Sequence, residues 1–248
     1  YTYTPNATAI NALTANASDS FTFSVSDGAG GSATQSFTVN ITGVNDTPTL
    51  SAPTAITLTD TAAADTFNVT TGTLSGADRD SGQTLSYGIS GSSAASLTSS
   101  ASGSSVTYNL QKAGTYGTLY LESTTGKYLF QPNSNASLNA LSASGSDSFT
   151  VSASDGNTTG SNTLSVNFTG ANDTPIVSAP AAIQLTDTAA ADTFSVTTGT
   201  LAATDAESNT LTYGISGSSA ASLNSSASGS SVTYNLQKAG TYGTLYVE

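Results

Sequence analysis

The sequence contains no cysteine and no histidine among its 248 residues. Without cysteine the chain can form neither disulfides nor thiolate metal sites, and it has no thiol nucleophile. Without histidine it lacks the side chain that most often serves as a general base near neutral pH. Its many serines do not form a G-x-S-x-G motif beside a candidate base. We therefore predict that the protein is not an enzyme.

Basic residues are also scarce, since 4 lysines and arginines stand against 16 acidic residues and give a net charge of −12. We expect no nucleic-acid partner, because binding phosphates requires lysine and arginine. Small cations suit this charge, since carboxylates are hard oxygen ligands. No apolar run approaches the roughly 18–20 residues of a membrane-spanning helix, so no membrane span is expected.

What the chain does have is a long internal repeat. Three stretches occur twice with few changes: residues 1–28 return as 128–156, 56–74 as 183–201, and 104–122 as 230–248. The period is roughly 127 residues, which is the size of a domain and too long for a solenoid repeat. This pattern predicts similar domains arranged in tandem.

The sequence Asn-Asp-Thr-Pro occurs once per period, at residues 45–48 (the first linker) and 172–175 (the second linker). Proline suits a linker, because it donates no N–H to a strand ladder. The expected parts are the C-terminal half of a repeat, one complete repeat and the N-terminal half of the next, at residues 1–48, 49–175 and 176–248. We thus expect the chain to be cut within a domain at both ends. The rival phasing, with domains at 1–122 and 128–248, would start and end domains on strands without a linker.

Short runs of alternating apolar and polar residues, bounded by Gly, Asn, Asp or Ser, predict β-strands throughout. In the complete repeat they cover residues 55–60, 65–74, 84–90, 105–111, 117–123, 127–132, 147–154 and 162–170. Residues 136–144 have helical spacing and predict a single helical turn crossing between two sheets. The Ser/Ala-rich run 91–105 predicts a loop or a weak edge hairpin. We expect an all-β fold of tandem antiparallel immunoglobulin-like (cadherin-like) β-sandwich repeats joined by short linkers.

Acidic and amide side chains recur in the loops expected at the linker end of each sandwich. At the first linker these are Asn45 and Asp46, the Asp-x-Asp loop with Asp78 and Asp80, Asp155 after a strand, and Asp19 from the preceding repeat. At the second linker they are Asn172, Asp173, Asp205, Glu207 and Asp147. Oxygen ligands of this kind and number are those that Ca²⁺ prefers, so we expect a calcium site at each linker. Turn formation is the alternative, because Asp and Asn also favour Asx-turns.

The run GTLYLESTTGKYLFQPNSNASLNAL, followed by DSFTVSASDG and VNFTGANDTP, resembles the VCBS repeat of large bacterial RTX-type adhesins. The resemblance covers essentially the whole chain. It implies tandem modules, type I secretion to the bacterial cell surface, and a role in extending an adhesive tip. It also implies Ca²⁺ bound between domains through linkers such as Asn45–Asp46 and Asn172–Asp173. The Ser-rich run 91–105 is longer than the family pattern, and the RTX nonapeptides are absent.

We therefore expect an extracellular spacer or stalk whose partners are neighbouring repeats of the same chain or fibre. One alternative is a self-assembling filament, in which the half repeat of one chain is completed by strand complementation from another. A second alternative is a carbohydrate-binding adhesion module. The absence of tryptophan weakens that alternative, since such sites favour exposed aromatic rings.

Overall fold

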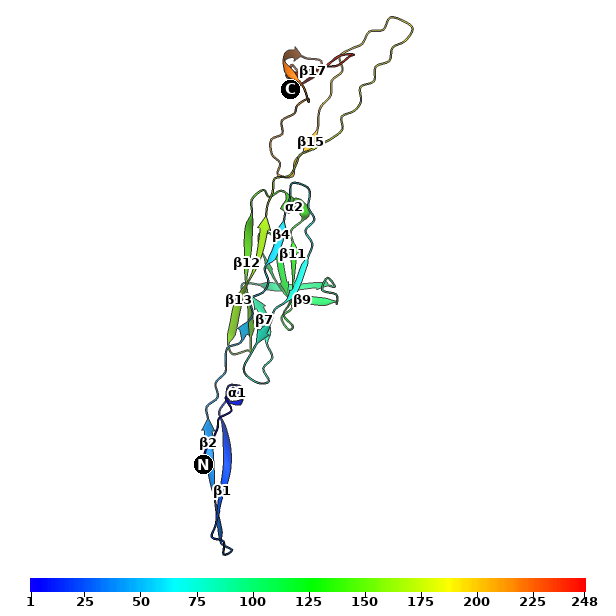
Figure 1. The fold of residues 1–248 in the computed structure, drawn as a ribbon. Helices are drawn as coiled ribbons and strands as arrows, with labels where there is room; N and C mark the ends of the chain where they lie inside the picture. The colour runs from blue at the N-terminus through cyan, green and yellow to red at the C-terminus, as the bar shows by residue number, and fades with distance from the viewer. The chain divides into compact units, whose positions relative to one another are not determined.

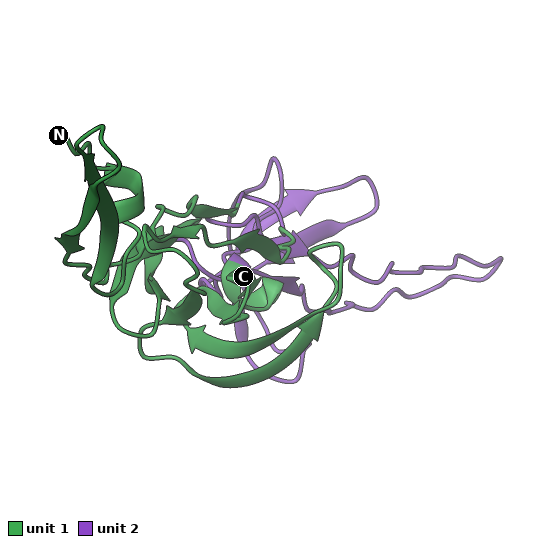
Figure 2. Cartoon of the chain, turned by 90° about the horizontal axis from the view of Figure 1, so that it is seen from below, with its two compact units in different colours: residues 1–60, 65–138, 143–170 green, residues 61–64, 139–142, 171–248 purple.

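A computed structural model describes all residues, 1–248, and it divides into two compact units (Figure 2). Unit 1 holds residues 1–60, 65–138 and 143–170, and unit 2 holds residues 61–64, 139–142 and 171–248. Each unit is described by itself. No helix in the structure is long and apolar enough to cross a membrane.

Unit 1 begins with a short helix and a long hairpin. Helix α1 (Ala7–Ile10) is capped by Asn6, whose side chain accepts a hydrogen bond from the Ala9 N–H at 3.2 Å. The hairpin pairs β1 (Ala17–Ser26) with β2 (Ser32–Ile41) in one unbroken antiparallel register. Its alternating pattern is the one predicted for strands, yet no residue of either strand is fully buried.

The rest of unit 1 is a β-sandwich of a five-stranded and a four-stranded sheet (Figure 1). The first sheet has the order β5-β11-β10-β9-β8, with β5 (Thr70–Thr73), β8 (Ser93–Ser99), β9 (Val106–Ala113), β10 (Gly117–Leu121) and β11 (Lys127–Pro132). The second has the order β4-β13-β12-β7, with β4 (Ile56–Thr59), β7 (Ser86–Ile89), β12 (Gly145–Ser154) and β13 (Thr159–Thr169). A small ladder joins β3 (Thr49–Leu50) to β6 (Gly76–Ala77).

Alternate residues of both sheets form the core between them. Among the fully buried side chains, Phe130, Leu119 and Leu121 come from the five-stranded sheet and Phe168, Leu164, Val151 and Val166 from the four-stranded sheet. Tyr108 and Leu129 form a second cluster with Val106, Leu97 and Tyr120. The core is thin, because small Ser, Thr, Ala and Gly residues fill many positions of the sequence. Aromatic contacts add to it: the rings of Tyr116 and Phe168 stack with centroids 4.9 Å apart.

The structure confirms the all-β fold and corrects one detail of the expected pairing. Strand β4 pairs with β13 in parallel, with Ile56 opposite Val166, so the four-stranded sheet is mixed instead of purely antiparallel. Helix α2 (Asn135–Asn139) is the expected helical turn, and it connects β11 in one sheet with β12 in the other. For the Ser-rich run the sequence left a loop or an edge hairpin open, and the structure shows the hairpin. Its strand β8 pairs with β9 at the margin of the five-stranded sheet.

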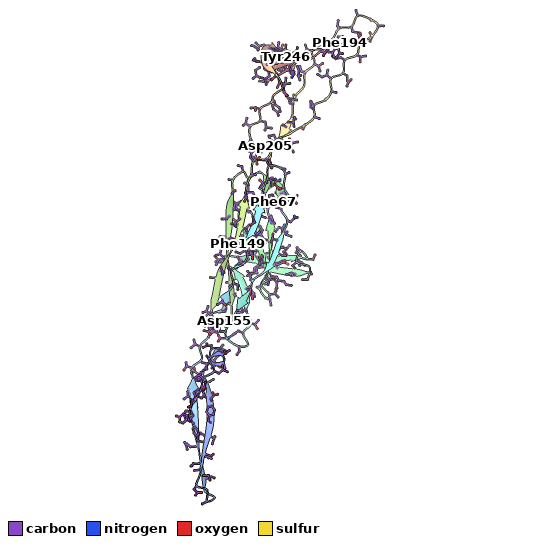
Figure 3. The ribbon with its side chains drawn as sticks, in the orientation of Figure 1. Phe67, Phe149, Asp155, Phe194, Asp205 and Tyr246 are labelled. Atoms are coloured by element: carbon purple, nitrogen blue, oxygen red, sulfur yellow. The ribbon has the colours of Figure 1, made fainter.

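Unit 2 contains five strands and a long stretch without any. Strands β14 (Ile176–Val177) and β15 (Ala203–Thr204) form a two-residue ladder. Strands β16 (Ser219–Ser225), β17 (Val232–Ala239) and β18 (Thr244–Val247) form an antiparallel sheet in that order. Residues 178–202 lie between β14 and β15 without a strand, and Phe194 lies on this extended segment (Figure 3).

Candidate functional site at the linkers

The acidic loop of unit 1 follows β6 and is shaped by its own carboxylates. The Asp80 N–H donates to Asp78 Oδ1 at 2.8 Å, which closes an Asx-turn. Asp78 is half-buried and Asp80 is only 5% exposed. One oxygen of Asp78 therefore forms an Asx-turn, as the turn alternative expects, whereas the carboxylate of Asp80 forms no such local turn.

Asp80 instead reaches back to the first linker. Its Oδ2 accepts a hydrogen bond from the Asp46 N–H at 2.7 Å, across 34 residues of sequence. Its Oδ1 is buried and has no hydrogen-bond partner, and the same is true of Asp78 Oδ2. Two buried carboxylate oxygens therefore remain unsatisfied beside the linker, which is costly for groups that carry negative charge.

The first linker is also hydrogen-bonded to the loop after β12. The Asn45 Nδ2 donates to Asp155 Oδ2 at 2.7 Å, and the N–H groups of Asn157 and Thr158 both donate to Asp155 Oδ1 at 2.7 Å. The Thr158 N–H and then the Asn45 amide hold the pKa of the Asp155 carboxyl at about 2, below its ordinary value. Asp155 (Figure 3) is thus ionised at neutral pH and fixed against the linker.

Close packing holds the exit of the first linker against the sandwich. Pro48 is fully buried. A Cβ at Gly160 of β13 would lie 2.0 Å from the Pro48 carbonyl oxygen, so only glycine permits this approach. The Asn162 Nδ2 then donates to the Leu50 carbonyl oxygen at 3.1 Å. The linker therefore leads directly into the folded sheet.

The acidic loop also contacts the segment that precedes the hairpin. Both the N–H and the Oγ of Ser81 donate to the Ala12 carbonyl oxygen, each at 3.2 Å. Four separate stretches of unit 1 are thus joined here by hydrogen bonds: the segment after α1, the linker and the two loops of the sandwich. Of the expected ligands, hydrogen bonds connect Asn45 to Asp155, Asp46 to Asp80, and Asp80 to Asp78.

The second linker repeats the central hydrogen bond within unit 2. The Asp173 N–H donates to Glu207 Oε1 at 2.9 Å, again across 34 residues. The linker amide is also used in the same way, since Nδ2 of Asn172 and of Asn45 each donate at 2.9 Å to the carbonyl oxygen of the next residue. Glu207 Oε2 is buried without a hydrogen-bond partner. Asp205 Oδ1 accepts from the Asn209 N–H at 3.1 Å (Figure 3 labels Asp205).

Two of the expected ligands have other roles. Asp147 is buried, and its two oxygens accept the N–H groups of Thr115 and Tyr116 at 2.8 Å each, so it fixes the turn between β9 and β10. Asp19 lies on β1, where its carboxylate accepts the Tyr3 hydroxyl at 2.8 Å. We therefore leave both residues out of the candidate site. As arranged, no three acidic side chains are grouped closely enough to chelate an ion.

Sequence reasoning missed Thr158 and Asn157, which complete the contacts of the first linker. The Thr158 Oγ1 lies 3.3 Å from the Asp46 carbonyl oxygen and 3.1 Å from Asp155 Oδ2, while Asn157 Nδ2 donates to Asn45 Oδ1 at 3.1 Å. The signal was present in the run Asp-Gly-Asn-Thr at 155–158, which is typical of an Asx-turn with a polar tip.

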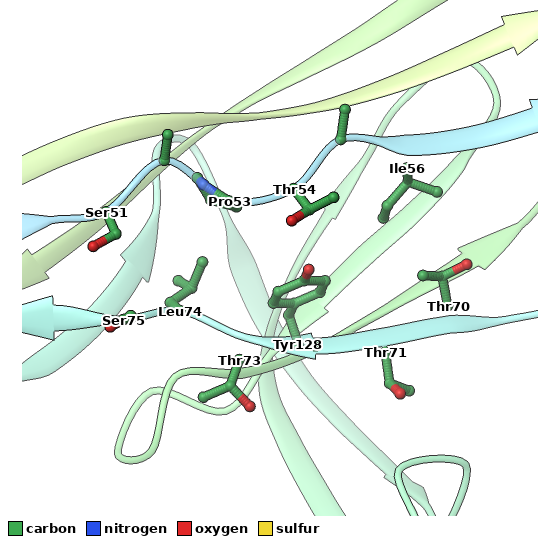
Figure 4. A pocket seen from close by; sticks show the side chains of 13 residues that line it. Ser51, Pro53, Thr54, Ile56, Thr70, Thr71, Thr73, Leu74, Ser75 and Tyr128 are labelled. Atoms are coloured by element: carbon green, nitrogen blue, oxygen red, sulfur yellow. The ribbon is translucent and has the colours of Figure 1, made fainter.

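A shallow groove of about 440 Å³ lies between residues 51–56 and β5 (Figure 4). Small Ser, Thr and Ala side chains line most of it, and Tyr128 is its one aromatic residue. Tyr128 is buried, and this burial raises the pKa of its hydroxyl. Because its ring face is not available for stacking, the groove does not support the carbohydrate-binding alternative.

Comparison with known proteins gives one family match. Residues 1–40, out of 248, match a family described as a bacterial Ig domain. The matched segment includes β1 and most of β2, and its sequence recurs in β12 and β13. The match is not to the VCBS repeat, so the finer resemblance stays a prediction. No curated protein sequence matches the chain.

Solved structures similar to the chain include several cadherin fragments. They include PcdhgB3 EC1-4 (12% identity, TM-score 0.34) and mouse cadherin-23 EC22-24 (13%, 0.32), which align with 65% and 62% of this chain. Drosophila N-cadherin EC1-4 aligns with 64% of it (16%, 0.30). The chain spans 34%, 42% and 35% of these three structures. Such low TM-scores do not establish a shared arrangement.

Proposed function

We propose that the chain is a structural repeat segment of an extracellular bacterial protein, and that Ca²⁺ stiffens its linkers. The observation that carries the proposal is one hydrogen bond made twice: the N–H of the linker aspartate donates to an acidic side chain of the next loop. It joins Asp46 to Asp80 at 2.7 Å and Asp173 to Glu207 at 2.9 Å. We keep the division into residues 1–48, 49–175 and 176–248 as part of this proposal.

The donor set at the first linker suits a hard cation. Asp78 Oδ2 and Asp80 Oδ1 are buried oxygens without a hydrogen-bond partner, and the other oxygen of Asp80 accepts the N–H of Asp46 in the linker. Ca²⁺ takes six to eight oxygen ligands, whereas Mg²⁺ demands tighter octahedral geometry and keeps its waters. When bound, Ca²⁺ would neutralise carboxylates that otherwise repel one another across the loop.

At the second linker the corresponding holders are Asn172, Asp173, Asp205 and Glu207. Glutamate stands where the first loop has Asp80, and it keeps the carboxylate while adding one methylene. Its Oε2 is the buried oxygen without a partner, as Oδ1 is in Asp80. The two linkers therefore share the bond from the aspartate N–H to an acidic side chain, even though Asp80 is replaced by Glu207.

The linkers resist bending through their own hydrogen bonds. Rotating the first linker would break the bonds from the Asp46 N–H to Asp80 and from the Asn45 amide to Asp155. A cation held by the same groups raises that cost, because bending would also remove its ligands. A site that forms only in the folded chain also stabilises the folded state by mass action, which links folding to a calcium-rich exterior.

A structural role is favoured over a catalytic one. The match of residues 1–40 to a bacterial Ig domain supports a repeat module, and the chain lacks histidine and cysteine. An adhesin of the RTX type, secretion by a type I system and a position at the bacterial cell surface remain what the VCBS resemblance implies. Neighbouring repeats are the partners that this role requires.

Calorimetric titration with Ca²⁺ tests the proposal. We expect two sites in the chain and one in the double variant Asp78→Asn, Asp80→Asn. Glu207→Gln should remove the other site. Asp27→Asn is the matched control, because Asp27 accepts only the N–H groups of a hairpin turn and should leave both sites intact. Absence of calcium binding would overturn the proposal, and unchanged stoichiometry in the variants would overturn the residue assignment.

A further inference from the structure

Strand β13 runs through the complete repeat from one linker towards the other. It begins at Thr159, just after Asp155, whose carboxylate accepts a hydrogen bond from Asn45 of the first linker. It ends at Thr169, and the second linker follows at residues 172–175. A pull on the chain from the second linker therefore acts along β13, towards its C-terminal end.

The segment that leaves the first linker runs beside β13 in the same direction. Near the start of β13, Pro48 packs closely against Gly160. The Asn162 Nδ2 then donates to the Leu50 carbonyl oxygen at 3.1 Å. Further along, β4 pairs with β13 in parallel (Figure 1). A pull from the first linker therefore draws β4 towards the beginning of β13, opposite to the pull from the second linker.

Opposite pulls on two parallel neighbours load the ladder between them in shear. The ladder runs from Ile56 opposite Val166 to Thr59 opposite Thr169. The Asp60 N–H extends it by donating to the Thr169 carbonyl oxygen at 2.9 Å. Because the bonds of a parallel ladder are evenly spaced, they share the force in shear and must break together. A strand that is peeled from one end loses its bonds one at a time, so it yields at a lower force.

Side-chain burial strengthens the same ladder. Ile56 and Leu58 of β4 are 4% and 5% exposed, and Val166 and Phe168 of β13 are also buried. Sliding β4 by one residue would turn its apolar side chains away from the core, since successive strand residues point to opposite faces. Shear must therefore expose apolar surface to water while it breaks the hydrogen bonds.

Other contacts near the linkers resist the same pull less well. The bonds of the first linker to Asp80 and Asp155 join single residues, and β3 pairs with β6 through only two residue pairs. Strand β7 lies at the opposite edge of the four-stranded sheet and pairs with β12 in antiparallel fashion. It follows β6 and precedes β8 in the chain, so neither linker pulls on it directly.

We propose that β4 and β13 form a mechanical clamp that keeps the repeat folded when the chain is under tension. The clamp consists of residues 56–59 and 166–169. This inference rests on the proposed role as a structural repeat segment, because tension reaches the repeat through its two linkers. It does not require calcium, since the clamp contains none of the candidate ligands.

Forced unfolding of the whole chain tests the proposal. Thr47→Cys and Thr174→Cys place one thiol in each linker for the attachment of DNA handles, because both threonines are exposed and the chain has no other cysteine. Optical tweezers then pull on the complete repeat through its own linkers. The measurement is made in a chelator, so that calcium cannot contribute to the unfolding force.

Ile56 and Ile89 provide a matched pair of variants in this background. Both lie on four-residue edge strands of the four-stranded sheet, and they are 4% and 5% exposed. Ile56→Ala and Ile89→Ala should therefore lower the urea midpoint by similar amounts. Only Ile56→Ala should lower the unfolding force, by about half, because forced unfolding is governed by the rate at which the loaded contacts break. If an alanine variant does not fold, Ile56→Val and Ile89→Val make the same comparison.

The direction of pulling provides a second test that leaves the clamp residues in the core unchanged. Handles on Thr59→Cys and Thr174→Cys pull from the end of the ladder and peel β4 from β13, since Thr59 is the exposed last residue of β4. We expect this geometry to unfold the repeat at a clearly lower force than handles on the two linkers.

Equal losses of force in Ile56→Ala and Ile89→Ala, or equal forces in the two pulling directions, would overturn the clamp. Neither result would bear on calcium binding. Conversely, failure to bind calcium in the titration would overturn the calcium proposal and leave the forces measured in chelator as expected.

Discussion

Residues 56–59 form β4 against β13, whereas the matching residues 183–186 form no strand. The two segments read ITLT and IQLT, so their alternation is the same. Ile56 is 4% exposed and its counterpart Ile183 is 56% exposed. The difference lies in the partner, because β13 lies beside residues 56–59 and no strand is paired with residues 183–186.

Strands with nearby partners form in both copies. The β8–β9 hairpin recurs as β16–β17, with the same register irregularity between Ala94 and Leu97 and between Ala220 and Leu223. The β3–β6 ladder likewise recurs as β14–β15. In contrast, β5 and β7 pair with β11 and β12 in the complete repeat and have no counterparts in unit 2.

The comparison shows which contacts allow the matching segments to form strands. Hairpins close short loops and retain their hydrogen bonds without outside help, whereas β4, β5 and β7 need partners from far along the sequence. Burying an aliphatic or aromatic side chain contributes about 1.5–3 kcal/mol. Phe67, whose ring lies 6.2 Å from that of Phe168, gains such a contact, and its counterpart Phe194 remains exposed (Figure 3).

The largest expected effect is the difference in stability lost when the matching phenylalanines of the two hairpins, β12–β13 and β1–β2, are replaced. Phe149→Ala should lower the free energy of unfolding of unit 1 by about 3–5 kcal/mol, because it leaves a cavity in the core. Phe21→Ala, the same change in the exposed hairpin, should cost less than about 1 kcal/mol in dilute solution. Urea unfolding followed by circular dichroism measures both. Equal losses would show that the two hairpins are equally buried, contrary to this account.

Replacing the matching aspartates Asp147 and Asp19 should also cost different amounts of stability, with the larger loss at the buried residue. Asp147→Ala should cost about 3 kcal/mol, because the N–H groups of Thr115 and Tyr116 would lose a charged, buried acceptor. Asp19→Ala removes an exposed carboxylate and should change stability little in dilute solution. Thermal melts of the two variants compare them. A larger loss from Asp19→Ala would contradict the assignment of Asp147 to the turn.

Alanine should lower stability at Gly72 but not at its matching position, Gly199. A Cβ at Gly72 would lie 2.3 Å from the Tyr128 ring, whereas Gly199 has open space around it. Gly72→Ala should therefore destabilise the β5–β11 ladder by about 1–2 kcal/mol. Gly199→Ala should be neutral or slightly stabilising, since alanine restricts the unfolded chain. Urea melts give both values, and a destabilising Gly199→Ala would mean that residues 197–200 are packed.

The smallest effect concerns protonation at the first linker. Asp155 has a pKa lowered to about 2, so it contributes stability above its ordinary pKa, and that stability is lost as the pH falls toward 2. Asn45→Ala removes one of the donors and should raise this pKa, which carboxyl NMR titration detects. Asn172→Ala, the matching change at the second linker, should leave the pKa of Asp155 unchanged. Identical Asp155 midpoints in the Asn45 variant and the parent would exclude the hydrogen bond.

Much of the fold could be predicted from the sequence because the alternation is regular. The strands, the helical turn containing Leu138 and the acidic loops all follow from local patterns. The parallel pairing of Ile56 with Val166 could not be predicted, since alternation shows which face is buried and not which strand lies beside it. The same limit explains Ile183: its pattern predicts burial, but a partner must be present to provide it.

The candidate site was predictable in its linker residues and less so around them. Asp80 and Glu207 could be placed because the repeat keeps a carboxylate at that position. Asp147 could not be distinguished from the predicted ligands, because its partners are backbone N–H groups, which every residue type except proline provides. The contribution of Thr158 likewise depends on the turn that brings its hydroxyl toward the linker.

The most direct test of the account is small-angle scattering combined with thermal melting of the whole chain, with Ca²⁺ and with a chelator. We predict a larger maximum dimension and a higher melting temperature with Ca²⁺, because the ion would hold the linker and loop carboxylates together. The double variant Asp78→Asn, Asp80→Asn should show only part of this response, and Asp27→Asn should show all of it. A maximum dimension and a melting temperature that are both the same with Ca²⁺ and with chelator would contradict the account.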